Sequence, residues 1–147
     1  MTQKVIILGA TGLLGRNLIR SCVKRNIKFI TVGRKNCEIN LDLTKIFNFK
    51  KLSKIVDQSI VINATGFTSL EKCEENFEKC YEINTKIVKN FFEHKFFRNF
   101  KFVQISTDQL YEGKKNLPNK ESDKIKIVNE YAKSKFEAEK ISFDGLN

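Results

Sequence analysis

Residues 5–15 decide the fold, and they read Val5-Ile6-Ile7-Leu8-Gly9-Ala10-Thr11-Gly12-Leu13-Leu14-Gly15. The first four form an apolar run that ends directly in glycine, which is typical of a buried parallel strand. Apolar residues then recur at helical spacing, so three glycines lie between a strand and a helix. There the first glycine permits a tight turn, the second lets the backbone approach a pyrophosphate, and the third allows close helix packing. The stretch predicts a loop that binds a dinucleotide through Gly9, Thr11, Gly12, Leu13, Leu14 and Gly15.

Strand and helix patterns alternate along the rest of the chain. Strand patterns cover residues 4–8, 29–32, 37–41, 59–63 and 100–105, and helical patterns cover residues 13–25, 44–56, 81–97 and 129–141. Such alternation predicts a parallel sheet with helices on both faces and right-handed crossovers. We therefore expect one α/β domain over residues 1–147, a doubly wound Rossmann-type sheet of about five strands in the order 3-2-1-4-5.

Three further features refine this expectation. Thr68 and Glu71 have the spacing of a capping box, in which each side chain satisfies a free backbone N–H of the other residue. Residues 114–126 are polar, contain the only proline and predict an irregular loop. The fifth strand is expected at an exposed edge of the sheet, where another chain can pair with it.

Composition and charge limit the classes of protein. The 147 residues are 41% hydrophobic and 30% charged, as in ordinary globular proteins, and no apolar run is long enough to span a bilayer. The net charge is +10, but the lysines are spread along the chain and no nucleic-acid-binding motif accompanies them. We therefore expect a cytoplasmic protein with neither nucleic acid nor a membrane as its partner.

Four cysteines, Cys22, Cys37, Cys73 and Cys80, form no C-x-x-C pair, and His94 is the only histidine. Cys73 and Cys80 are seven residues apart on a predicted helical stretch, which suits buried thiols better than metal ligands. We expect reduced cysteines that pack in the interior and no metal site.

Arg34 indicates which dinucleotide is preferred. A site for NAD often has an acidic residue at the end of the second strand, where it binds the ribose 2′-OH. This chain has Gly33-Arg34-Lys35 there, and a guanidinium pairs well with a 2′-phosphate. The sequence therefore favours NADP(H) over NAD, although Arg34 as a solvated loop cation is the alternative.

Tyr131 and Lys135 are four residues apart on the last predicted helix, so both lie on one face of it. An ammonium near a phenol lowers the pKa of the phenol and prepares it to exchange a proton with a carbonyl/alcohol couple. Ser106-Thr107-Asp108 follow the fifth strand, at the edge of an open parallel sheet where ligands bind. A hydroxyl from this block can polarise the same carbonyl oxygen.

With these motifs in this order, the chain resembles the extended short-chain dehydrogenase/reductase family, and within it the dTDP-4-dehydrorhamnose reductases. The likeness covers nearly the whole chain through Leu41-Asp42, residues 62–68, 81–84 and 105–113, and Tyr131-Ala132-Lys133-Ser134-Lys135. Ala132 and Ile127 stand where relatives often have glycine and proline.

The resemblance implies a role for each matched residue. Asp42 and Leu43 would contact the adenine of the cofactor. The cofactor would also be lined by Ala64, Thr65 and Gly66, and Asn84 would order the site. Tyr131 would be the acid, Lys135 would tune it and hold the nicotinamide ribose, and Thr107 would bind the substrate oxygen. Asp108 would lie near the sugar.

For function, the resemblance implies NADPH-dependent reduction of the C4 ketone of a 4-keto-6-deoxy sugar nucleotide, or the cofactor-binding portion of such a reductase. Family members continue into a C-terminal part that binds the nucleotide sugar, which this chain lacks, so we expect a domain truncated relative to the family. Two alternatives stay open: a non-catalytic NADP-binding module or remnant, and a nucleotide-sugar epimerase or dehydratase. A homodimer or a partner chain covering the fifth strand is also expected.

Overall fold

The computed structural model describes residues 3–93, 97–113 and 117–145. Five parallel strands form one sheet in the order β3-β2-β1-β4-β5, as the sequence predicts. The strands are β1 Val5–Leu8, β2 Phe29–Gly33, β3 Ile39–Asn40, β4 Ile60–Asn63 and β5 Lys101–Gln104. β1 is buried along its whole length because it lies at the centre of the sheet between β2 and β4.

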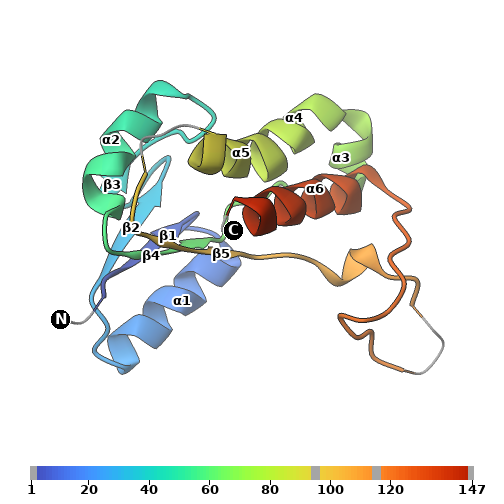
Figure 1. Ribbon diagram of the computed structural model, residues 1–147, viewed down its shortest axis with the longest axis horizontal. Coiled ribbons are helices and arrows are strands. Elements are labelled where there is room, and N and C mark those ends of the chain that lie inside the picture. The colour runs from blue at the N-terminus through green and yellow to red at the C-terminus, as the bar shows by residue number, and fades with distance from the viewer. Residues whose placement is uncertain (1–2, 94–96, 114–116, 146–147) are drawn as a thin grey trace.

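Helices cover the two faces of the sheet unequally (Figure 1). Helix α1, Leu13–Lys24, packs on one face. The opposite face carries α2 Phe47–Val56, α3 Leu70–Glu75, α4 Phe77–Tyr81, the π-helical turn η1 Glu82–Lys86, α5 Ile87–Glu93 and α6 Glu130–Asp144. The larger apolar core lies on this second face, where rings from α2, α5 and β5 meet in an aromatic cluster. None of the helices in the described ranges is long and apolar enough to cross a membrane.

The register of the sheet brings the functional loops to one edge. Leu8 is level with Val32 on one side and with Asn63 on the other, and Asn63 is level with Gln104. The four segments that follow these residues therefore leave the sheet side by side. They are the glycine loop, Gly33-Arg34, Ala64-Thr65-Gly66 and Ile105-Ser106-Thr107.

Three predicted helix boundaries are wrong, and one is the start of α2, which was expected at residue 44 and lies at Phe47. The capping box at Thr68 and Glu71 does not form, because α3 begins one residue later and the Ser69 hydroxyl accepts from the Lys72 N–H at 3.4 Å. The helix predicted over residues 81–97 instead begins in α4, widens at η1 and is described as far as Glu93. Phe97 is not helical, and residues 94–96, with His94, lie outside the described residues.

The remaining sequence expectations about packing are met by the described residues. Cys22, Cys73 and Cys80 are buried and Cys37 is half-buried, as expected of packing residues. Cys73 and Cys80 lie on two short helices, α3 and α4, because Asn76 caps the second of these. At the edge of the sheet β5 pairs only with β4 among the described strands, and Val103 on it is 42% exposed.

Candidate active site

The glycine loop has the backbone geometry that its spacing predicts. Gly9 has a φ of +73°, and a Cβ there would lie 2.7 Å from the Ala64 carbonyl oxygen. A Cβ on Gly15 would lie 2.4 Å from the Gly9 carbonyl oxygen, so α1 can approach the turn this closely only with glycine. Both positions exclude a larger side chain for steric reasons.

The N-terminus of α1 is open to a ligand. Gly12 is the N-cap residue and supplies no side chain to accept the first N–H groups of the helix. Thr11, Leu13 and Leu14 are exposed around it, and Leu13 is 76% exposed. Free N–H groups and the helix dipole together favour a bound phosphate at this place. The loop therefore fits a pyrophosphate.

Arg34 follows β2 at the same edge and lies near Asp42. Burial disfavours the charged form of Asp42, but hydrogen bonds from Thr44 and the charges of Lys45 and Arg34 hold the pKa of its carboxyl below the ordinary value. The Thr44 N–H and hydroxyl donate to Asp42 Oδ1 at 3.0 and 2.8 Å. Arg34 itself is exposed and makes no ion pair with any other described residue. Its guanidinium is therefore accessible to a phosphate.

Leu43, expected beside the adenine, is only 4% exposed and belongs to the main apolar core. Of the expected pair, Asp42 is the residue with exposed surface to offer a ligand.

The loop after β4 is held by a polar chain that sequence reasoning did not assign. Asn63 Nδ2 donates to Gln104 Oε1 at 2.8 Å, which ties the ends of β4 and β5 together. Asn63 Oδ1 accepts from the Thr65 hydroxyl at 2.6 Å and from its N–H at 3.2 Å. Ala64 and Thr65 thereby lie against the turn at Gly9. The sequence signal for this contact is that the predicted fourth and fifth strands each carry an amide side chain near the end, Asn63 and Gln104, which pair in the sheet.

Thr107 and Tyr131 meet although they come from different elements. Thr107 caps the short 3-10 helix η2, Asp108–Leu110, after β5, and Tyr131 lies in the first turn of α6. Burial raises the pKa of Tyr131 above its ordinary value, a hydrogen bond from the Thr107 hydroxyl opposes the rise, and nearby Cys73, Cys80 and Asp108 add to it. The expectation that Lys135 lowers the pKa of this phenol is therefore wrong for the protein without a ligand, because burial outweighs the other influences and Lys135 is not one of them. The phenol is therefore protonated at neutral pH and is placed beside a second hydroxyl.

Lys135 lies one turn after Tyr131 and is 3% exposed. Burial lowers its pKa from 10.5 to about 8, and the negative charge of Glu139 only partly offsets this by raising the pKa. No ion pair forms between Lys135 and another described residue. A buried ammonium without a paired anion favours an anionic or hydroxyl-rich ligand beside it.

The start of α6 is anchored on both sides, and this fixes where Tyr131 and Lys135 point. Asn129 accepts from the Ala132 N–H at 2.7 Å as the N-cap residue, and Glu74 of α3 accepts from the Glu130 N–H at 2.7 Å. An acceptor at these free N–H groups stabilises the helix end, and a carboxylate there also complements the helix dipole.

A buried polar network holds the middle of this turn. Asn84 donates through Nδ2 to Ser134 Oγ at 2.9 Å and to the Phe67 carbonyl at 3.1 Å, and its Oδ1 accepts from the Phe67 N–H at 2.7 Å. Ser134 Oγ donates to the Tyr131 carbonyl at 2.7 Å and contacts Cys80 Sγ at 3.3 Å. Thr85 donates to the Ser134 carbonyl at 2.8 Å. Asn84 therefore links the β4 loop to the helix that carries Tyr131, and Ser134, Thr85 and Cys80 are partners that the sequence did not reveal.

Three further observations concern the site and its surroundings. The Ser106 hydroxyl is buried without a hydrogen-bond partner among the described residues, next to Thr107. A groove of about 720 Å³ lies elsewhere, on the outer surface of α4, η1 and α5, and none of the predicted site residues lines it. No group of three His, Cys, Asp or Glu side chains within the described ranges is placed to hold a metal ion.

Comparison with known proteins finds the family described as "RmlD substrate binding domain", which matches residues 3–144. A dTDP-4-dehydrorhamnose reductase of Aggregatibacter actinomycetemcomitans is 30% identical over 94% of this chain and 46% of the relative. The spore coat polysaccharide biosynthesis protein SpsK of Bacillus subtilis is 29% identical over 90% of this chain and 45% of the relative. The chain spans about half the length of the curated relatives it matches.

Solved structures show the same correspondence. A dTDP-4-dehydrorhamnose reductase from Clostridium acetobutylicum superposes with a TM-score of 0.83 and 30% identity, covering 97% of this chain and 49% of that one. The dTDP-4-dehydrorhamnose reductase of Bacillus anthracis, solved in complex with NADP, superposes with a TM-score of 0.82 and 25% identity. The match covers 98% of this chain and 50% of that one.

Proposed function

Because the chain belongs to the RmlD substrate binding domain family, we propose that it binds NADP(H) and provides the cofactor-binding, proton-donating part of a reductase that acts on a 4-keto-6-deoxy sugar nucleotide. The observation that carries the proposal is the hydrogen bond between Thr107, which follows the end of β5, and Tyr131, with Lys135 buried one turn further along α6.

The residues of the loop fit the cofactor. The N-terminus of α1 receives the pyrophosphate, since its first N–H groups have no capping side chain and the glycines admit close approach. Arg34 binds the 2′-phosphate, which distinguishes NADP from NAD. Asp42, kept ionised by Thr44 and the neighbouring cations, accepts a hydrogen bond from the adenine side.

Tyr131 is the proton donor in this proposal. NADPH, when bound, supplies the hydride that a ketone carbon accepts during reduction. The carbonyl oxygen must gain one proton in the same reaction, and Tyr131 donates it because its phenol is protonated at neutral pH. Thr107 donates a hydrogen bond to the same oxygen, and the Lys135 ammonium stabilises the phenolate that remains.

Titration of the full chain with NADPH and with NADH, followed by cofactor fluorescence, tests the binding part of the proposal. NADPH oxidation in the presence of a dTDP-4-keto-6-deoxy sugar tests the reaction, with Tyr131→Phe as the matched variant. We expect NADPH to bind both proteins and turnover to fall at least about 100-fold in the variant. Failure to bind NADPH overturns the proposal. Binding without turnover overturns the reductase part and favours a cofactor-binding module.

A further inference from the structure

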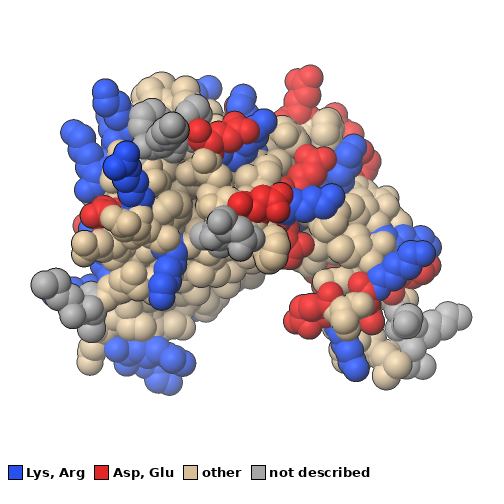
Figure 2. All heavy atoms as spheres, viewed as in Figure 1, with Lys and Arg blue, Asp and Glu red and all other residues tan. Residues whose placement is uncertain are grey.

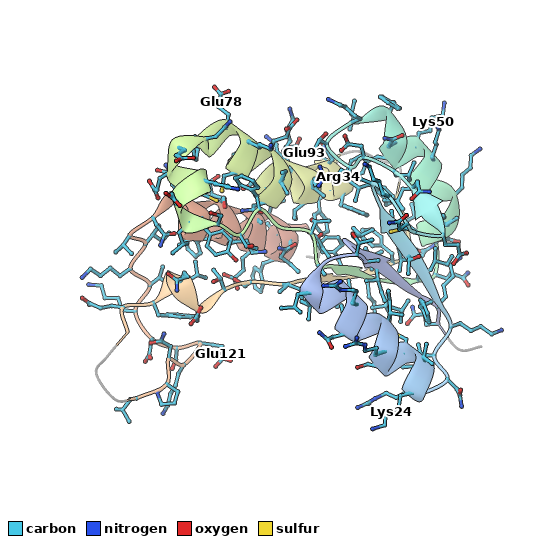
Figure 3. The ribbon with its side chains drawn as sticks, turned by 180° about the vertical axis from the view of Figure 1, so that it is seen from behind. Lys24, Arg34, Lys50, Glu78, Glu93 and Glu121 are labelled. Atoms are coloured by element: carbon cyan, nitrogen blue, oxygen red, sulfur yellow. The ribbon has the colours of Figure 1, made fainter. Side chains whose placement is uncertain are left out.

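The excess of positive charge lies almost entirely in the N-terminal segment of the sequence. Residues 1–57 contain 12 Lys or Arg and 3 Asp or Glu, whereas residues 58–147 contain 15 and 14. Nine of the ten net positive charges therefore belong to the segment that ends with α2. In Figure 2 Lys and Arg gather at the end of the molecule that α2 occupies in Figure 1, and Asp and Glu predominate toward the other end. Figure 3 shows Lys50 and Glu78 at opposite ends.

These cations are not neutralised within the protein. All Lys and Arg residues from Arg16 to Lys54 are exposed, and none forms an ion pair with another described residue. The three ion pairs between described residues all lie in the second segment, from Lys89 onward. The first segment thus keeps a field that attracts anions from solution.

Helix α2 concentrates this field on one face. Phe47, Lys50, Lys51 and Lys54 follow the i, i+3, i+4, i+7 spacing of a single helix face, while Phe49, Leu52 and Val56 point into the core. Ile46 and Phe47, at the start of the helix, are 44% and 65% exposed. We call the set Ile46, Phe47, Lys50, Lys51 and Lys54 the basic face of α2.

We propose that the basic face of α2 docks this protein on an anionic phospholipid surface. Lysines around exposed apolar side chains match such a surface, because the ammonium groups meet the phosphates while Phe47 and Ile46 enter the boundary with the acyl chains. A convex helix can lie flat on a bilayer. A single-stranded nucleic acid prefers a groove with several stacking aromatics, and Ile46 has no ring to stack. This contact needs no spanning helix, and it departs from the expectation, drawn from the even spread of lysines, that no membrane is a partner.

The proposal is independent of the cofactor site. The residues to be substituted, Phe47, Lys50, Lys51 and Lys54, do not belong to the predicted site. All four are exposed, so their substitution leaves the fold and the glycine loop intact. Lys45 is left unchanged in the test because its charge influences the pKa of Asp42.

Co-sedimentation of the full chain with vesicles tests the proposal, using phosphatidylcholine alone and phosphatidylcholine with roughly 30% phosphatidylserine. We expect binding only to the anionic vesicles, weaker at about 0.5 M salt than at about 0.1 M. The triple variant Lys50→Gln, Lys51→Gln, Lys54→Gln should bind about 10- to 100-fold more weakly, and Phe47→Gln at least about threefold more weakly.

The matched control is Arg20→Gln, Lys24→Gln, Arg25→Gln on α1 and its C-cap residue, which removes three exposed charges from the opposite face of the sheet. It should reduce vesicle binding much less than the α2 triple variant. Equal loss in both triple variants, no binding to anionic vesicles, an unchanged affinity in Phe47→Gln, or binding of a polyuridine oligonucleotide in place of vesicles would each overturn the proposal. NADPH affinity, measured in parallel, should stay the same in all variants.

Discussion

The Nδ2 atom of Asn84 lies 2.9 Å from the Oγ atom of Ser134, and this contact joins the π-helical turn η1 to α6 across 50 residues of sequence. Both side chains are at most 1% exposed. Because Ser134 also donates to the Tyr131 carbonyl, the contact sets the rotation of the helix that presents Tyr131 on one side and Lys135 on the next turn.

Ser134→Ala is therefore expected to lower the free energy of unfolding by about 1–3 kcal/mol, since Asn84 loses a buried hydrogen-bond partner. Urea denaturation measures this. Ser53→Ala is the control, because the Ser53 hydroxyl bonds only the Lys50 carbonyl on the surface of α2, and it should change stability by less than about 0.5 kcal/mol. Equal stability of Ser134→Ala and the unchanged protein would contradict the role given to this contact.

Gly9→Ala should destabilise the protein by about 2 kcal/mol or more and abolish NADPH binding. The substitution forces a side chain into a positive φ and against the Ala64 carbonyl, so the turn between β1 and α1 must shift. Denaturation and cofactor fluorescence measure the two effects. Gly113→Ala serves as the control, because a Cβ there meets nothing within 4 Å. Similar losses in both variants would show that the turn is not the cause.

Thr107→Val is expected to raise the pKa of Tyr131 further, since burial already raises it and the Thr107 hydroxyl is the group that lowers it. Tyrosinate absorbance during an alkaline titration reports the change. The same titration of Tyr131→Phe gives the contribution of Tyr81 and Tyr111, to be subtracted. A tyrosine titration that does not move in Thr107→Val would show that the two side chains do not interact.

The sheet order and the glycine loop could be predicted from the sequence because each depends on local pattern and on the handedness of crossovers. The start of α3 could not. Thr68 and Ser69 are both able to cap a helix, and the choice follows from tertiary contacts such as that of the Cys73 thiol with the Phe67 carbonyl, 3.3 Å away.

The candidate site likewise has residues that the sequence predicts and contacts that only the folded structure reveals. Tyr131, Lys135 and Thr107 are visible as motifs at strand and helix ends. The partner Ser134 of Asn84 is not, because Ser134 reaches Asn84 only after α6 has packed beside η1. The widened turn at η1 is also invisible in a helical pattern, since the apolar spacing of residues 83, 87 and 91 continues through it.

Arg34→Gln should weaken NADPH binding about tenfold or more and leave NADH binding unchanged, because only NADPH carries the 2′-phosphate that the guanidinium pairs with. Fluorescence titrations with both cofactors measure the ratio. Lys24→Gln removes one exposed charge at the far end of α1 and controls for the general field of the protein. Equal affinities for NADPH and NADH in the unchanged protein would contradict the assignment of Arg34.

Lys135→Met is expected to stabilise the cofactor-free protein below pH 8 by up to about 3 kcal/mol while weakening NADPH binding. Burial lowers the pKa of Lys135 from 10.5 to about 8, so at lower pH the folded state must carry a charge that it disfavours. Between pH 8 and 10.5 the unfolded chain binds more protons than the folded one. The unchanged protein therefore gains stability relative to Lys135→Met as pH rises through this range.

Urea denaturation of both proteins at intervals from pH 7 to about 10.5 measures this difference. The raised pKa of Cys73 affects both proteins alike and cancels in the comparison. Lys133→Met is the control, because Lys133 is exposed and pairs with Glu130 on the surface of α6, so its substitution should change the free energy of unfolding only slightly. A stability difference for Lys135→Met that stays constant from pH 7 to 10.5 would mean that the ammonium is hydrated in the folded protein, and the proposed stabilisation of a Tyr131 phenolate by a desolvated cation would fail with it.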